Sequence, residues 1–176
     1  MPHAGRGSGR RRGRIGKKGD DAMKVLLAID ESEYSENAVN EVGERAWTPG
    51  TTVRVLHVVE KFVPTAQELW YDAGGDLERL KAEAAERGRE MTERAAKWLR
   101  GRGLQVETAL REGDPHKLIV EEAKQWGADL VVVGSHGYTG LKRLLLGSVA
   151  QSVVDDATCP VEVVHQKEAG GGSDGE

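Results

Sequence analysis

The feature that most constrains the fold of this chain is a regular alternation of short apolar runs with segments of helical periodicity. The apolar runs, rich in Val, Leu and Ile, predict strands at residues 24–29, 53–59, 104–110, 129–133 and 160–164. The segments between them predict helices at about 33–46, 76–100, 115–126 and 147–157. Asp114 as N-cap and Pro115 at the first helical position predict where the third of these helices begins. Because strands joined by helical crossovers are parallel and the crossovers are right-handed, few topologies remain.

The alternation predicts an α/β fold with a doubly wound, flavodoxin-like sheet. We expect five parallel strands in the order 3-2-1-4-5, with helices on both faces. Sheets of this kind bind ligands beyond the carboxyl ends of the strands, where the strand order reverses. The residues that follow the first and fourth strands, Asp30 and Gly134, are therefore expected at a ligand site.

Length and charge predict one folded domain with a tail at each end. The chain has 176 residues; residues 1–22 carry seven Lys or Arg against two Asp, a net charge of +5, which leaves −9 for the rest. We expect residues 1–22 to form a basic disordered leader, 23–166 the domain, and 167–176 a Gly-rich disordered tail. The leader either contacts nucleic acid or an anionic surface, or reflects a start site placed before Met23. The acidic domain argues against a nucleic-acid-binding face on the fold itself.

Cysteine content and hydropathy point to the cytoplasm. The single cysteine, Cys159, excludes an intrachain disulfide and fits a reducing compartment. No apolar stretch approaches the roughly 20 residues of a membrane span. The arginine-rich start lacks the apolar region of a secretory signal. We therefore expect a cytoplasmic protein without a membrane partner.

The segment that carries chemistry follows the fourth predicted strand. Its motif is Gly-x2-Gly-x9-Gly-Ser, formed by Gly134, Gly137, Gly147 and Ser148. Glycine allows tight turns and lets the backbone approach a ligand, while exposed N–H groups and a helix N-terminus favour a phosphate. His136 and Arg143 are candidates for further phosphate contacts. The alternative is that these glycines serve only turns and close helix packing.

This pattern resembles the ATP-binding signature of the universal stress protein family. The likeness extends to AIDESEYSENAV after the first strand, GDPHKLIVEEA, GADLVVVGSHG and CPVEVV, and covers residues 23–165. The family also has a branch that lacks the signature and does not bind ATP, whereas this chain keeps every signature position. The resemblance implies an ATP-binding stress-response or regulatory protein, with Mg²⁺ carried by the phosphates and an unidentified regulatory partner.

The resemblance also implies the residues of the site. Ala28, Val58 and Val133 would line the adenine pocket, Asp30 would contact the adenosine, and Gly134, Gly137, Gly147, Ser148 and Val149 would hold ribose and phosphates. For Asp30 the alternative is a helix cap.

Three catalytic motifs are missing from the positions where this fold would carry them. No Lys precedes Ser148 as in a Walker loop, no Gly-x-Gly-x-x-Gly dinucleotide fingerprint follows the first strand, and Ser135 follows Gly134 directly, which does not match the Gly-x-Ser-x-Gly of a hydrolase elbow. No His, Cys or Asp cluster has metal-site spacing, and His57, at the end of the second strand, is expected to be a hydrogen-bonded core residue. We expect binding rather than catalysis; a slow ATPase or autokinase, and an interaction module with a vestigial site, remain alternatives.

Two further segments predict contacts. Residues 62–75 form a long connection with four aromatic or large apolar side chains, and we expect it to fold over the ligand or a partner subunit. The fifth strand is a short apolar edge strand containing Val161 and Val163. Because an exposed edge invites pairing, it predicts an antiparallel, two-fold homodimer, as the family resemblance also implies.

Overall fold

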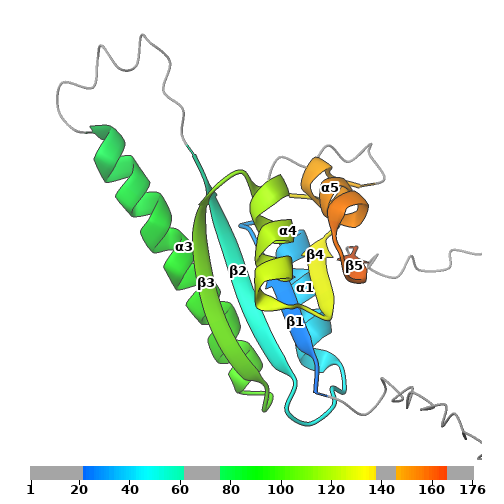
Figure 1. Cartoon of the computed structure of the whole chain (residues 1–176). Helices are drawn as coiled ribbons and strands as arrows, with labels where there is room; N and C mark the ends of the chain where they lie inside the picture. The colour runs from blue at the N-terminus through cyan, green and yellow to red at the C-terminus, as the bar shows by residue number, and fades with distance from the viewer. Residues whose placement is uncertain (1–21, 62–75, 138–145, 166–176) are drawn as a thin grey trace, which may run out of the picture.

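The sheet has the predicted topology. The computed structural model describes residues 22–61, 76–137 and 146–165. Its elements are β1 (Lys24–Ala28), α1 (Glu33–Glu44), β2 (Thr52–Glu60), α3 (Asp76–Arg100), β3 (Gln105–Gly113), α4 (Pro115–Trp126), β4 (Leu130–Gly134), α5 (Ser148–Asp156) and β5 (Val161–Val164). All strand pairs are parallel, in the order β3-β2-β1-β4-β5 (Figure 1), which confirms the doubly wound, flavodoxin-like fold.

The largest error in the predicted boundaries lies at β3. This strand was expected to end at Leu110, but it continues to Gly113 because it pairs with β2 along its whole length. Hydrogen bonding to a neighbouring strand keeps this polar end of β3 extended, although its sequence contains no apolar run. Boundaries elsewhere differ by fewer residues, as for β2, which begins at Thr52 and ends at Glu60.

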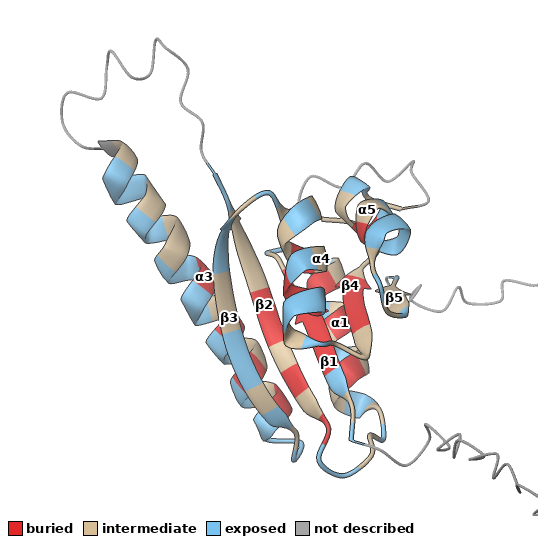
Figure 2. Cartoon of the chain, viewed as in Figure 1, coloured by how far each residue is buried: buried red, intermediate tan, exposed pale blue. Residues whose placement is uncertain are grey.

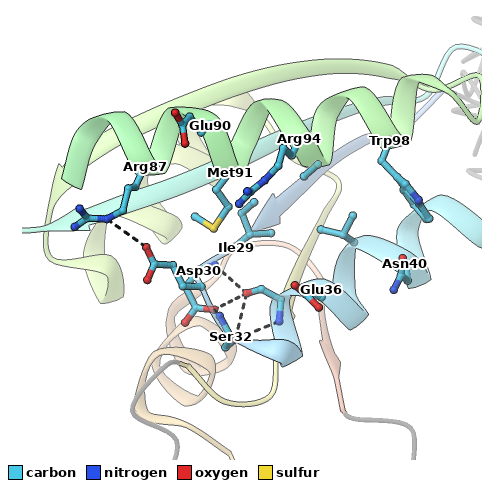
Figure 3. A pocket seen from close by; sticks show the side chains of 14 residues that line it. Ile29, Asp30, Ser32, Glu36, Asn40, Arg87, Glu90, Met91, Arg94 and Trp98 are labelled. Carbon is cyan, nitrogen blue, oxygen red and sulfur yellow. Dashed lines mark hydrogen bonds and ion pairs between the residues drawn. The ribbon is translucent and has the colours of Figure 1, made fainter. Parts of the chain in front are cut away.

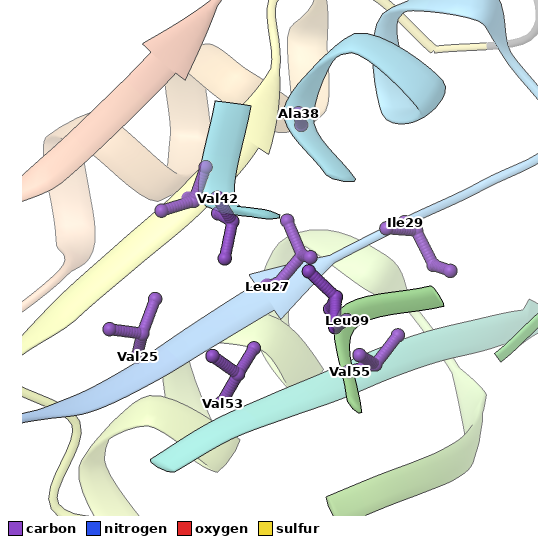
Figure 4. Close-up of a cluster of buried hydrophobic side chains, with 9 residues drawn as sticks. Val25, Leu27, Ile29, Ala38, Val42, Val53, Val55 and Leu99 are labelled. Carbon is purple, nitrogen blue, oxygen red and sulfur yellow. The ribbon is translucent and has the colours of Figure 1, made fainter. Parts of the chain in front are cut away.

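Each face of the sheet carries its own core, and β1 contributes to both. Most of β1 is buried (Figure 2). Val25 and Leu27 belong to the cluster beneath α1 and α3 (Figure 4), whereas Leu26 and Ala28 belong to the cluster beneath α4 and α5. Successive side chains of a strand point to opposite faces, so a strand covered by helices on both sides must be apolar throughout. This explains the continuous apolar run of β1.

Local capping fixes the start of α4 as the sequence predicts. The Asp114 side chain accepts a hydrogen bond from the His116 N–H, and Pro115 occupies the first helical position. At the other end Gly127 adopts a left-handed conformation with φ of 72° and stops the helix. The two caps thereby define where α4 begins and ends.

An ion-pair network around the buried Glu122 joins α4 to β2 and β3. Glu122 of α4 is only 3% exposed, and its two carboxylate oxygens accept hydrogen bonds from Arg54 at 2.7 Å and from Arg111 at 2.6 Å. The Arg54 guanidinium lies 4.4 Å from the centre of the Trp126 ring. Burial by itself raises the pKa of Glu122, but the hydrogen bonds and charges of Arg111 and Arg54 outweigh it, so the pKa lies below its usual value.

The network predicts a pH-dependent contribution to stability. Because the pKa of Glu122 is lowered by folding, its contribution is present above the unfolded-state value of 4.5 and is lost as the pH falls through the folded-state value. Glu122→Gln should therefore lower the free energy of unfolding by about 2 kcal/mol at neutral pH, the scale of a hydrogen bond to a charged group. The difference from the unsubstituted chain should shrink under acid conditions, as measured by urea denaturation. Glu121→Gln, on the exposed side of α4, is the matched control; an equal loss in both variants would contradict the prediction.

Candidate functional site

A cavity lies at the carboxyl ends of β1 and β4, where the strand order reverses. Eight residues expected from the sequence line it: Ala28, Asp30, Val58, Val133, Gly134, His136, Gly137 and Val149. They come from the ends of three strands, the segment after β4 and the first turn of α5. The tertiary structure therefore brings together residues that are more than 100 positions apart in the chain.

One side of the cavity is apolar. Ala28, Val58 and Val133 form this surface together with Leu56 and Ile119. Sequence reasoning missed the last two. Leu56 lies two positions before Val58 and therefore points to the same face of β2, so the sequence could have predicted its place in the cavity. Ile119 comes from α4, and only the packing of this helix on the sheet places it in the cavity.

The polar side of the cavity is organised around Asp30. Its Oδ1 accepts hydrogen bonds from the Ser32 hydroxyl and, at 2.6 Å, from the Ser35 hydroxyl. The backbone N–H of Asp30 in turn donates to Ser35 Oγ at 2.8 Å. Both serines are buried, at 7% and 5% exposure, so the Asp30 side chain is held in a fixed orientation at the end of β1.

Asp30 is not the N-cap of α1. That position belongs to Ser32, whose hydroxyl oxygen accepts a hydrogen bond from the Ser35 N–H. The alternative prediction, that Asp30 is the N-cap of this helix, is therefore wrong. Ser35 contacts Asp30 from inside the first turn of α1 and was not identified from the sequence, because the letters alone do not show which face of this turn meets the strand end.

The glycines after β4 serve close approach rather than left-handed turns. Gly134, Gly137 and Gly147 all lack a positive φ, so none of them is needed for a left-handed backbone. A Cβ on Gly134 would lie 2.8 Å from Tyr34 Cβ, so the start of α1 packs directly on this backbone. A Cβ on Gly137 would lie 3.1 Å from Asp30 Oδ2, at the cavity wall.

The N-terminus of α5 lies beside the cavity. Its N-cap is Gly147, which has no side chain to bond the amides of the first turn, and the Gly147 N–H donates to the Ser135 carbonyl oxygen at 2.7 Å. Ser148 is exposed at the first helical position, and neither residue is part of the cavity lining itself. Arg143 and the segment 62–75 lie outside the described residues.

Two histidines near the site differ in their surroundings. His136 lines the cavity, with its ring centre 4.9 Å from that of Tyr34 and Nδ1 3.1 Å from Ser135 Oγ. His57 was predicted at the end of the second strand but lies inside β2. Its Nδ1 is 2.9 Å from the Ile29 carbonyl oxygen. His57 therefore bonds neighbouring backbone and does not line the cavity.

The described part of the chain also limits other kinds of site. Within residues 22–61, 76–137 and 146–165, no group of three His, Cys, Asp or Glu side chains is arranged to hold a metal ion. No helix among these residues is both long and apolar enough to cross a membrane.

Fold and cavity together define a flavodoxin-like α/β protein with a cavity at the switch point of its sheet, where proteins of this fold class bind ligands. The model of the universal stress protein family matches residues 22–165. Universal stress protein YxiE of Bacillus subtilis is 34% identical over 144 residues, which cover 80% of this chain and 97% of that protein. The chain thus belongs to the universal stress protein family.

Solved structures agree with this assignment. The structure of MJ0577, a universal stress protein of Methanocaldococcus jannaschii, superposes with a TM-score of 0.72 at 32% identity and covers 84% of this chain and 98% of that one. A family protein from Arabidopsis thaliana, At3g01520, was crystallised with AMP bound. Its TM-score is 0.57 at 20% identity, with coverage of 83% of this chain and 93% of that one, so this likeness concerns the fold.

The contact between Gly134 and α1 predicts a stability effect separate from ligand binding. Gly134→Ala places a Cβ against the Cβ and backbone of Tyr34, and overpacking of this kind costs about 1–3 kcal/mol. Thermal unfolding should show a clear drop in melting temperature. Gly137→Ala is the matched control, since its Cβ would meet only the end of the Asp30 side chain. Equal melting temperatures for the two variants would rule out this packing role.

Proposed function

We propose that the protein binds ATP in the cavity at the ends of β1 and β4 and acts as a nucleotide-dependent stress-response or regulatory protein. The observation that carries the proposal is the combination of groups that line this cavity. They are an apolar surface, the fixed Asp30 carboxylate and the glycine backbone of Gly134 and Gly137, and the N-terminus of α5 lies beside them. Base, ribose and phosphates of a nucleotide need these same kinds of contact.

The apolar surface suits adenine. Ala28, Val58 and Val133 would contact the faces of the base, and Asp30 would accept hydrogen bonds from the adenosine. The phosphates would extend past Gly137 to Gly147, Ser148 and Val149. Hydrogen bonds to a charged group contribute about 1.5–3 kcal/mol each. A few of them together with burial of the base reach the roughly −8 kcal/mol of micromolar binding.

Mg²⁺ would enter with the nucleotide. The described residues around the start of α5 supply hydroxyl and amide groups but no cluster of carboxylates for a protein-held ion. The ion would therefore be coordinated mainly by the phosphates. The AMP bound to the related Arabidopsis protein supports a nucleotide as the ligand class.

The proposal includes a homodimer formed through β5. Val131 N–H donates to the Pro160 carbonyl oxygen and Ser135 N–H to that of Val164, so these residues face β4. Backbone groups alternate in direction along a strand, which turns those of Val161 and Val163 toward the open edge. The side chains of both residues pack against the core beneath α4 and α5. The backbone would form the seam with a second copy, while the regulatory partner and the cytoplasmic location stay predictions from the sequence.

The nucleotide site is tested by adding bulk at Gly137. Gly137→Val puts a branched side chain between Asp30 and the proposed phosphate path, so the affinity for Mg-ATP should fall at least about tenfold, or about 1.4 kcal/mol. Isothermal titration calorimetry measures the affinity, and analysis of the recovered nucleotide for ADP shows whether turnover occurs. Gly101→Val, at the exposed end of α3, is the control. Unchanged affinity in Gly137→Val with an intact circular dichroism spectrum would refute the site.

The dimer is tested at the backbone of β5. Val163→Pro removes an N–H that faces the open edge without removing a bond to β4, and proline is tolerated on edge strands. Light scattering should show a shift from dimer to monomer. Val163→Ile keeps the N–H and should remain dimeric. An unsubstituted chain that is monomeric at high micromolar concentration would contradict the proposed dimer.

A further inference from the structure

A second cavity lies on the opposite face of the sheet, between α1 and α3 (Figure 3). We call it the α1–α3 groove; its volume is about 490 Å³. Its apolar lining consists of Ile29, Val39, Met91, Ala95 and Trp98. The Trp98 ring of α3 occupies the space that a side chain at Gly43 of α1 would take, and the groove extends from this contact toward the start of α1.

The charged lining of the groove has an acidic excess. It contains four carboxylates, Asp30, Glu31, Glu36 and Glu90, against the two guanidinium groups of Arg87 and Arg94. Arg87 lies 3.8 Å from Glu31, so these two charges largely offset each other. The remaining excess favours an occupant that combines positive charge with a small apolar anchor.

The chain itself contains a segment of this chemistry. Residues 1–21 lie outside the described residues and hold seven Lys or Arg against two Asp. Within this segment Ile15 stands between Arg14 and the pair Lys17 and Lys18. One apolar side chain flanked by cations matches an apolar groove with an acidic excess.

The connection to the domain brings this segment to the right face. Met23 packs against the same core cluster as Val39, Met91 and Trp98 of the groove. The seven residues from Gly16 to Ala22, which join Ile15 to Met23, can span about 23 Å when extended. The stretch of α3 from Arg87 to Trp98 is about 16 Å long at the helical rise. The tether is therefore long enough to place Ile15 along the groove.

We infer that the basic segment 1–21 docks in the α1–α3 groove of its own chain, with Ile15 on the apolar lining and basic side chains toward Glu36 and Glu90. A short tether gives an effective concentration in the millimolar range, so weak contacts are sufficient. Ile29, Asp30 and Ser35 line both the groove and the nucleotide cavity. The docked segment would thus lie against the residues that hold Asp30 in place.

The experiment uses the full chain without nucleotide, so its outcome is independent of the proposed ATP site. Cys159→Ser removes the native thiol, and Ser8→Cys carries a nitroxide spin label within the basic segment. Amide NMR signals of α1 and α3 around the groove should lose intensity, while those of α4 and α5 on the opposite face should not. Glu36→Lys combined with Glu90→Lys should abolish this loss, as should about 0.5 M salt, which screens the charges.

A matched pair of substitutions controls for net charge. Glu121→Lys combined with Asp156→Lys makes the same change on exposed positions of α4 and α5 and should leave the signal loss at the groove intact. Signal loss spread evenly over both faces, or unaffected by the substitutions at Glu36 and Glu90, would overturn the inference. In a further sample, a chain that carries the NMR isotope label but no nitroxide is mixed with a chain that carries the nitroxide but no isotope label. Loss of amide signal around the groove in this mixture would assign the occupant to a second copy and overturn docking within one chain.

Discussion

The central constraint of this molecule is the position of β1 in the middle of a doubly wound sheet. Its neighbours β2 and β4 lead toward opposite edges of the sheet. The helices α1 and α3 therefore cover one face, and α4 and α5 cover the other. The connection that leaves β1 turns to one face, and the connection that leaves β4 turns to the other. Because these two connections turn to opposite faces, a crevice forms between the ends of β1 and β4. β1 must also be apolar on both sides, because helices cover both faces of the sheet.

The geometry of the crevice depends on how closely α1 approaches β4. Gly134 gives the first turn of this helix room to pack on the backbone of β4, which brings Ser35 against Asp30. The serine hydroxyls then hold the carboxylate in one orientation. A bulkier residue at Gly134 would displace the helix start and the hydrogen-bonding partners of Asp30 together. The packing of α1 on β4 therefore also determines the orientation of Asp30 in the cavity.

The two faces of the sheet differ in how they stabilise their helices. On the α4 face, Glu122 and its two arginines form a hydrogen-bonded network beneath the helix, and the apolar residues of the switch-point cavity lie on this same face. On the α1 face, the helices meet at Gly43 and Trp98 and leave a groove beside this contact. Asp30 and Ser35 line both the switch-point cavity and the α1–α3 groove. A structural change in one of these cavities therefore directly affects residues of the other.

Sequence alone determined the features that depend on local physics. Apolar runs predicted the strands, Asp114 and Pro115 predicted the start of α4, and the glycine motif included two residues, Gly134 and Gly137, that line the cavity, because periodicity, capping and backbone freedom are properties of neighbouring residues. The contribution of Ser35 and Ile119 to the cavity was decided only by tertiary structure. The extension of β3 to Gly113 and the packing role of Gly134 were decided in the same way. Each depends on which distant segment lies alongside, and such contacts form only when the sheet brings the segments together.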